Sequence, residues 1–196
     1  MLIDKRVTDD IILIEKSPDA RITSVKMAIG KNRLHILNIY APSGSKFQKE
    51  REDFFKHEIL YYLRNNLNNT ILGGDFNCIT NVKDKSKNGT CPVSRGLQTT
   101  VNNLNLKDIW YTCNDNVEFT FFRENYGSRI DRFYATEIND KVSSIYVKPI
   151  TFSDHSCVIA ELDMGCNASL GHFYWKLNTK LLELENIENE SAFFLR

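Results

Sequence analysis

Four segments of the chain combine side chains that hydrolytic chemistry uses, and each follows an apolar stretch. Tyr40 ends the apolar run at residues 33–40. The other three are residues 74–77 (Gly-Asp-Phe-Asn), 128–131 (Ser-Arg-Ile-Asp) and 153–156 (Ser-Asp-His-Ser). Mixed α/β folds tend to place their sites at the ends of strands. We therefore expect these segments, remote in sequence, to meet at one mouth of a two-sheet sandwich.

The segments supply most of the groups that hydrolysis of a phosphodiester needs. That reaction requires a group that activates or orients water, donors or a cation for the charge on the phosphate oxygens, and assistance to the leaving oxygen. Asp131 can orient His155 by accepting a ring N–H, as carboxylates do for histidine in other hydrolases. Asp75 can hold the attacking water, and Asn77 can donate its amide to a phosphate oxygen.

Asp154 and Tyr40 complete this set. Asp154 can bind or tune a cation, and Tyr40 can donate to the phosphate or stabilise the leaving oxygen. Each residue also has a structural interpretation when taken alone. A Gly-Asp-x-Asn loop is commonly a turn, a tyrosine after an apolar strand commonly belongs to the core, and Asp131 can form a surface ion pair with Arg129 or Arg132. The combination of all the segments favours the catalytic interpretation.

Strands and helices must position these residues. Apolar alternation and turn residues predict strands, and apolar stripes at helical spacing predict helices. The strands are predicted at residues 11–15, 21–29, 33–40, 70–74, 118–123, 128–134, 142–150 and 157–162, and the helices at residues 45–66, from an N-cap at Ser94 through residue 104, and at residues 177–184. Residues 118–123 and 128–134 are expected to pair as a hairpin, and the polar residues 81–90 to form a mobile loop. This order of elements predicts an α/β sandwich with mixed sheets.

Composition restricts the class of protein. The 196 residues suit one domain, or a domain and a tail, and 42% hydrophobic residues suffice for a core. The five cysteines are scattered without a Cys-x-x-Cys pair, which argues against a zinc site and for reduced thiols in the cytosol or nucleus. Charge directly after the short apolar N-terminus argues against a signal peptide, and no apolar run approaches a membrane span. A formal net charge of zero argues weakly against tight non-specific DNA binding.

Taken in order, the four segments resemble the endonuclease/exonuclease/phosphatase superfamily, which includes AP endonucleases and DNase I. Residues 38–42 (Asn-Ile-Tyr-Ala-Pro) resemble its strand that ends in tyrosine, and residues 73–77 its Gly-Asp-Phe-Asn motif. Residues 128–133 resemble its Arg-Ile-Asp-Tyr segment, and residues 153–155 its Ser-Asp-His signature. The resemblance implies a four-layered α/β sandwich of the DNase I-like type with mixed, mostly antiparallel sheets.

Further details resemble the endonucleases of LINE-type (non-LTR) retrotransposons. The sequences Ile-Tyr-Ala-Pro-Ser and Gly-Gly-Asp-Phe-Asn-Cys are typical of these endonucleases. Residues 171–178 (Gly-His-Phe-Tyr-Trp-Lys-Leu-Asn) resemble the connector that precedes the reverse transcriptase in LINE polyproteins. We therefore expect an endonuclease domain over residues 1–163 and a connector over residues 164–196, within a longer parent that carries a reverse transcriptase.

The resemblance implies nicking of DNA with Mg²⁺ or Mn²⁺, at a target site for reverse transcription, in the nucleus or cytoplasm. The catalytic residues that it implies are Asp75, Asn77, Asp131, His155 and Tyr40. The residues that would contact the substrate are Tyr40, Asn77, Thr120 and Arg129, and Asp154 would lie by the metal.

The sequence departs from the superfamily at its start. Members begin with a strand that ends in Asn and a second strand that ends in Gln-Glu, whose Glu is the principal Mg²⁺ ligand. Neither segment is found here, and residues 1–3 align with a later strand. We therefore expect a sandwich that is missing its first strands, with weak metal binding, impaired nicking and bare sheet edges.

Three alternatives remain open at this point. An active phosphodiesterase would need a substitute cation ligand. A non-catalytic remnant that binds nucleic acid would show salt-dependent DNA binding without cleavage. An incomplete gene model would place the missing strands upstream of Met1.

Overall fold

The computed structural model describes residues 1–4, 7–8, 10–63 and 67–165, with residues 138 and 139 described through their backbone only. The described residues all belong to the first of the two units into which the chain divides, Met1–Cys166. Of the predicted connector at residues 164–196, the structure describes residues 164 and 165 only, and the predicted helix at residues 177–184 lies outside the described residues. None of the helices within the described ranges has the length and apolarity that crossing a membrane requires.

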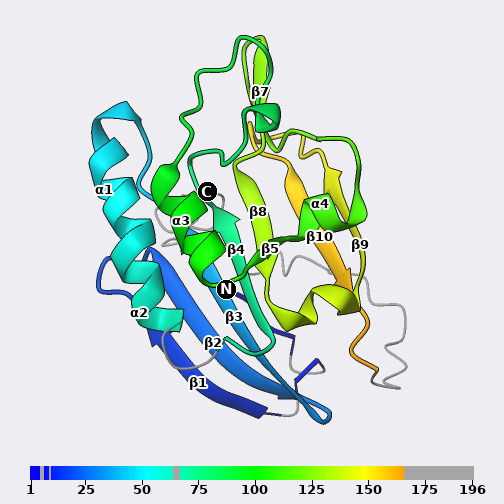
Figure 1. The fold of residues 1–196 in the computed structure, drawn as a ribbon. Coiled ribbons are helices and arrows are strands. Elements are labelled where there is room, and N and C mark those ends of the chain that lie inside the picture. The colour runs from blue at the N-terminus through cyan, green and yellow to red at the C-terminus, as the bar shows by residue number, and fades with distance from the viewer. Residues whose placement is uncertain (5–6, 9, 64–66, 166–196) are drawn as a thin grey trace, which may run out of the picture. The chain divides into compact units, whose positions relative to one another are not determined.

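A six-stranded mixed sheet forms the centre of the first unit (Figure 1). Its strands, in spatial order, are β1 (Asp10–Lys16), β2 (Ile22–Ile29), β3 (Asn32–Tyr40), β4 (Thr70–Asp75), β8 (Asp131–Ala135) and β5 (Lys107–Asp108). Neighbouring strands are antiparallel except β3 and β4, which are parallel. Parallel neighbours need a long crossover connection, and the helical residues between β3 and β4 provide it.

The crossover is one continuous helical run. It consists of η1 (Ser45–Phe47), α1 (Gln48–Asp53), η2 (Phe54–Glu58) and α2 (Ile59–Leu63), of which η2 is a π-helical turn. The predicted helix at residues 45–66 is therefore confirmed over its described part. Phe54, Phe55, Ile59 and Leu63 bury their side chains against one face of the sheet. Phe47, in the short η1 at the start of the run, is exposed.

A second helix covers the same face. α3 (Arg95–Asn103) begins at Ser94, whose Oγ accepts a hydrogen bond from Leu97 N at 3.0 Å. The predicted N-cap is confirmed, because this hydroxyl satisfies one of the free amides of the first turn. Leu97 is fully buried in the same cluster as Leu37 and Ile39 of β3.

The opposite face of the large sheet is covered by a second sheet. β9 (Val142–Lys148) and β10 (Cys157–Leu162) form a separate antiparallel pair. With the short α4 (Ile109–Cys113) they enclose a second apolar cluster. Its buried members include Val25, Met27, Leu34, Ile71, Trp110 and Ile145. The predicted α/β sandwich with mixed, mostly antiparallel sheets is confirmed by this arrangement.

A third pair of strands, β6 (Phe121–Arg123) and β7 (Tyr126–Ser128), forms a projecting hairpin (Figure 1). The prediction that residues 128–134 stay paired with it was wrong beyond Ser128. The chain turns at Arg129 and Ile130, where Arg129 N donates to Asp84 O at 2.7 Å, and β8 then joins β4 and β5. β5, α4, η3 (Val82–Asp84) and η4 (Glu137–Lys141) are too short to leave a periodic signal in the sequence.

β1 is the outer strand of the large sheet and its apolar residues are unusually open. Ile11, Ile12, Leu13 and Ile14 are all exposed. The pairing of β1 with β2 shifts between Ile11 and Leu13, so Ile12 is an extra residue in a β-bulge. Bulges at sheet edges interrupt the row of backbone groups that another strand would use.

Candidate active site

Three neighbouring strands place three of the predicted residues in one row. In the parallel pair β3–β4, Tyr40 lies opposite Asp75, and in the antiparallel pair β4–β8, Asp75 lies opposite Asp131. Strand ends that were separated by 35 and 56 residues therefore meet at one edge of the sheet. This register brings Asp75 and Asp131 together, as the positions of the strand ends predicted.

Gly74 allows β4 to pass close to β3 just before Asp75. Its φ of 136° lies in a region that side chains rarely adopt, and a Cβ atom there would stand 2.0 Å from Ile39 O. Glycine is therefore required where β4 passes closest to β3. Directly afterwards, Phe76 is buried and donates its N–H to Ile130 O at 2.9 Å, which fixes the loop to the start of β8.

Asn77 holds the Asp75 carboxylate in place. Its backbone N–H donates to Asp75 Oδ1 at 2.8 Å, and its side-chain Nδ2 donates to Asp75 Oδ2 at 3.2 Å and to Ala41 O at 2.9 Å. A φ of 49° permits this folding back, which asparagine tolerates better than most residues. Both amide protons of Asn77 thus meet protein acceptors, and the side chain orients Asp75 in this structure.

Asp131 and His155 form the second half of the site. Asp131 Oδ2 lies 2.9 Å from His155 Nδ1 and accepts a hydrogen bond from Thr120 Oγ1 at 2.7 Å. The hydroxyl of the fully buried Thr120 also accepts from the backbone N–H groups of Ile130 and Asp131, at 3.1 and 3.0 Å. Thr120, predicted as a substrate contact, is thereby placed beneath the carboxylate that orients the histidine.

The turn that carries His155 is fixed from two sides. His155 N donates to Ser153 Oγ at 3.0 Å, and Ser156 N donates to Thr120 O at 2.6 Å. The Phe121 ring packs on the imidazole with 4.9 Å between the ring centroids. These contacts hold the imidazole with Nδ1 toward Asp131, and Nε2 makes no hydrogen bond to any described residue.

Two titrating groups of this cluster are shifted toward neutral pH. Burial, and next the charge of Asp131, raise the pKa of Asp75 to about 7. The hydrogen bond from His155 to Asp131 raises the pKa of His155, against the opposing effect of burial. The Asp75 carboxyl group therefore exchanges its proton close to neutral pH, and the raised pKa of His155 favours its protonated form, as acid–base catalysis requires.

The cluster also fits a divalent cation. Ligand atoms of Asp75, Asp131 and His155 all lie within 4.8 Å of one another. Asp131 Oδ1 accepts no hydrogen bond from any described residue, and carboxylate oxygens are the donors that Mg²⁺ prefers. A cation between Asp75 and Asp131 would relieve the repulsion that raises the pKa of Asp75.

Three predicted residues stand apart from this cluster. Asp154, predicted to lie by the metal, is exposed and is not one of the clustered ligands, and its carbonyl accepts from Phe122 N at 2.9 Å. Tyr40 lies at the rim, 48% exposed, with the Arg21 guanidinium 5.9 Å from its ring centroid. Arg129, predicted to bind substrate, is 1% exposed and faces the protein interior.

Arg129 belongs to a buried charge network that the sequence did not reveal. Arg129 donates to Asp84 Oδ1 at 2.9 Å and to Asp108 Oδ2 at 2.6 Å, so its guanidinium is committed to protein carboxylates. Arg132, also fully buried, donates to Asp84 Oδ2 at 3.0 Å and to Thr80 Oγ1 at 2.9 Å. Asp84, itself 0% exposed, accepts a further hydrogen bond from Tyr111 Oη at 2.6 Å. This network holds the turn between β7 and β8 in place.

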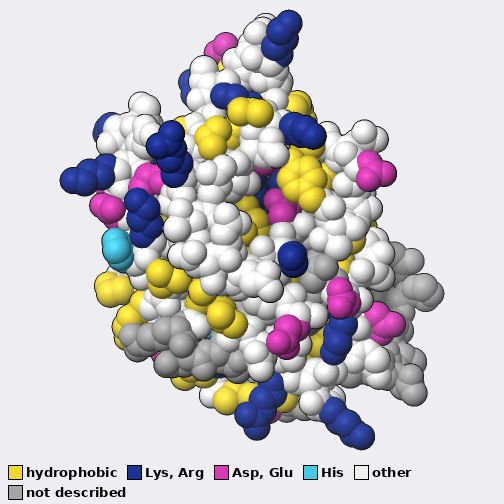
Figure 2. All heavy atoms as spheres, in the orientation of Figure 1, with side chains coloured by type: hydrophobic (Ala, Val, Ile, Leu, Met, Phe, Trp, Pro, Cys, Tyr) yellow, Lys and Arg dark blue, Asp and Glu magenta, His cyan; other side chains and the backbone are white. Residues whose placement is uncertain are grey.

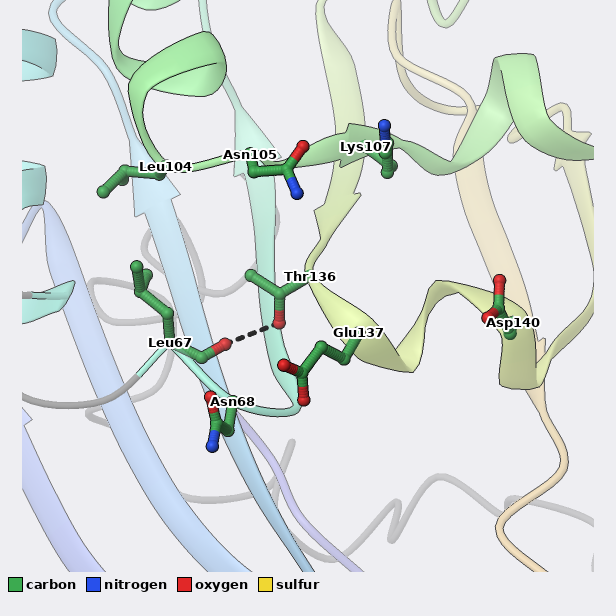
Figure 3. Close-up of a pocket in the computed structure, with 8 residues that line it drawn as sticks. All are labelled: Leu67, Asn68, Leu104, Asn105, Lys107, Thr136, Glu137 and Asp140. Carbon is green, nitrogen blue, oxygen red and sulfur yellow. Dashed lines mark hydrogen bonds between the residues drawn. The ribbon is translucent and has the colours of Figure 1, made fainter.

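A cavity of 270 Å³ lies at the opposite end of β4 and β8 (Figure 3). Leu67, Leu104 and Lys107 line it together with Thr136, which directly follows β8. Asp75 and Asp131 mark the other ends of these two strands, about 15 Å away at the usual rise per strand residue. The cavity is therefore separate from the cluster.

On the face shown in Figure 2, Lys and Arg side chains are spread over the surface and intermixed with acidic ones, with several around the projecting hairpin end. This distribution agrees with the formal net charge of zero. Attraction of a polyanion would therefore depend on a few local cations.

Comparison with solved structures identifies the class of fold. The endonuclease domain of TRAS1, a telomere-specific non-LTR retrotransposon, matches with a TM-score of 0.58 and 20% sequence identity, over 79% of this chain and 69% of that chain. A truncated Caenorhabditis elegans TDP2 matches with a TM-score of 0.46 and 19% identity, over 76% of this chain and 62% of that one. No protein-family model matches the chain.

The likeness to the TRAS1 endonuclease domain shows that the chain has the DNase I-like fold. The predicted resemblance to the endonuclease/exonuclease/phosphatase superfamily is confirmed at the level of the fold. The activity has to be inferred from the side chains.

The replacement Asp84→Ala is expected to lower the free energy of unfolding by about 3–5 kcal/mol, because it leaves two buried guanidinium groups short of a carboxylate. Tyr111→Phe, which removes one hydrogen bond to the same carboxylate, should cost only about 1 kcal/mol. Urea unfolding of both variants, with the exposed Asp115→Ala as a control, measures the difference. Equal losses for Asp84→Ala and Asp115→Ala would contradict the role of the network.

The free energy of unfolding is expected to fall as the pH rises from about 4 to about 7, because of the titration of Asp75. In the folded chain the pKa of Asp75 is about 7, whereas in the unfolded chain it has its ordinary value of 3.8. The protonated carboxyl group therefore contributes its full stabilisation below that ordinary value. This contribution is lost as the pH rises to about 7. The raised pKa of His155 acts in the same direction at higher pH. Asp75→Asn should flatten this part of the urea-unfolding profile, and Asp115→Asn should leave it intact. A profile with the same slope in Asp75→Asn would refute the raised pKa.

Proposed function

We propose that this chain is a DNA endonuclease that hydrolyses phosphodiester bonds. The observation that carries the proposal is the cluster of Asp75, Asp131 and His155, in which Asp131 holds the imidazole, the pKa of Asp75 is raised to about 7 and the pKa of His155 is also raised. The DNase I-like fold, shared with the endonuclease domain of a retrotransposon, supports DNA as the substrate.

Asp75 and His155 divide the proton transfers between them. Asp75, with a pKa of about 7, is ionised in a substantial fraction of molecules at neutral pH and can take a proton from an attacking water. His155 keeps Nδ1 on Asp131 and directs Nε2 away from it, so the imidazolium can donate from Nε2 to a phosphate oxygen. Asp131 favours this charged form of His155, and Thr120 keeps the Asp131 carboxylate in place.

Divalent cation binding belongs to the same proposal. Asp75 and Asp131 would hold Mg²⁺ or Mn²⁺, and the bound ion would supply Lewis-acid stabilisation of the phosphate charge. The proposed binding is weak, because these are the only two carboxylates that the described residues place in the cluster, and Asp131 already bonds two donors. We accordingly propose slow nicking.

The biological setting is an extension of this proposal. The sequence resemblance of residues 171–182 to a LINE connector supports a longer parent with a reverse transcriptase. A nick that leaves a 3′-hydroxyl would then prime reverse transcription at the target site. The activity would accordingly be located where the protein has access to chromosomal DNA.

Conversion of supercoiled plasmid to the nicked form tests the activity. With Mg²⁺, the intact chain is expected to nick plasmid slowly, and His155→Ala should reduce the rate by about 10²–10⁴-fold because it removes the proton donor. Arg33→Met, at the far end of β3 from Tyr40, should nick like the intact chain. Equal nicking by His155→Ala and the intact chain would reject the assignment. Salt-dependent DNA binding with no nicking at all would favour a non-catalytic DNA-binding protein.

Titration with Mg²⁺ and Mn²⁺ tests the cation site separately. We expect millimolar or weaker binding by calorimetry, with proton release below about pH 7 because the ion displaces the Asp75 proton. Asp75→Asn should abolish the heat and the proton release, whereas Asp154→Asn should retain both. Loss of binding in Asp154→Asn alone would move the site to the exposed carboxylate.

A further inference from the structure

Arg51 is a buried cation in the helix that follows β3. It lies in α1 with 2% of its surface exposed, and among the described residues no carboxylate forms an ion pair with it. Its Nε is buried and makes no hydrogen bond to the described residues. Burying a guanidinium in this way costs free energy that an apolar side chain of similar length would not. The packing of α1 on the sheet therefore does not require an arginine here.

The guanidinium is bonded to the turn that follows β3. Arg51 Nη1 donates to Pro42 O at 2.7 Å and to Gly44 O at 3.3 Å. Gly44 has a φ of 87°, which glycine adopts readily and residues with a side chain rarely do. A single side chain from the helix thus fixes two carbonyl groups of the turn.

The same turn carries a hydrogen bond of the candidate active site at its other end. Ala41 N donates to Asp75 O at 2.9 Å, and Ala41 O accepts from Asn77 Nδ2 at 2.9 Å. Peptide groups are planar, and proline restricts its own φ, so the direction of the Ala41 carbonyl is coupled to the position of Pro42. Asn77 Nδ2 in turn bonds Asp75 Oδ2, which completes a path from the helix to the carboxylate.

We propose that Arg51 is a positioning residue for the Asp75–Asn77 half of the active site, acting through the carbonyl groups of residues 41–44. Its effect on catalysis rests on the proposed endonuclease function, but its effect on Asn77 does not. Both hydrogen bonds leave from Nη1, whose N–H groups lie in the fixed plane of the guanidinium, whereas the ammonium group of lysine rotates freely, so arginine fixes the two carbonyls more firmly than lysine would.

Three variants of the full chain test the proposal: Arg51→Met, Arg51→Lys, and Arg33→Met as a control at an exposed arginine of β3. Thermal unfolding first shows that each variant folds. The side-chain NH₂ resonance of Asn77, assigned by its loss in Asn77→Asp, then reports on the bond to Ala41 O. In Arg51→Met its protons should exchange about tenfold faster than in the intact chain, with an intermediate value in Arg51→Lys and no change in Arg33→Met.

Nicking kinetics give the second readout. In Arg51→Met, kcat should fall about 10- to 100-fold with little change in KM, because misplacement of a reacting group affects the chemical step, and Arg51→Lys should recover part of it. An Asn77 resonance that exchanges at the same rate in Arg51→Met and the intact chain would overturn the proposal whatever the activity. An intact chain that never nicks would overturn the proposed function, and faster Asn77 exchange in Arg51→Met would still support the positioning role.

Discussion

The buried charges around Asp84 are the constraint on which the site depends. Two fully buried arginines, Arg129 and Arg132, are neutralised by Asp84 and Asp108, and none of these charges could be removed singly without leaving another unpaired in the interior. The network fixes where the chain leaves the hairpin and enters β8, and so sets the position of Asp131. Through the bond from Arg132 to Thr80 it also reaches the loop that follows Asn77. Both halves of the cluster are thereby attached to one rigid support.

Much of the site could be predicted because strand ends are visible in a sequence. The apolar runs before Tyr40, Asp75 and His155 mark strands or the turns between them, and the register of the sheet then brings Asp75 and Asp131 together. The N-cap at Ser94 could be predicted for a similar reason, because its hydroxyl accepts a hydrogen bond from an amide only three residues further along the chain. What local patterns could not give is the partner of a charge: Asp84 and Asp108 lie 45 and 21 residues from Arg129. Polar composition made residues 81–90 look like a mobile loop, whereas Asp84 in that segment is fully buried.

The roles of Asn77 and Asp154 show a second limit. An asparagine amide that can donate to a phosphate can equally donate to a carbonyl. Asn77 Nδ2 donates to Ala41 O, which directly follows β3 and is remote from Asn77 in the sequence. Asp154 neighbours His155 in sequence, yet adjacent residues of an extended turn point in different directions, and only His155 joins the clustered ligands. Proximity in sequence was therefore a poor guide to proximity in the site.

The bulge in β1 has a consequence for how the chain behaves in solution. Four consecutive aliphatic residues lie on an open strand, a composition that usually leads to stacking of one molecule on the next. One surplus residue, Ile12, breaks the even spacing of outward amides and carbonyls along that strand. The bulge thus opposes pairing of this edge with another strand, and an insertion or deletion that restored even spacing would favour such pairing more than a change of side chain would.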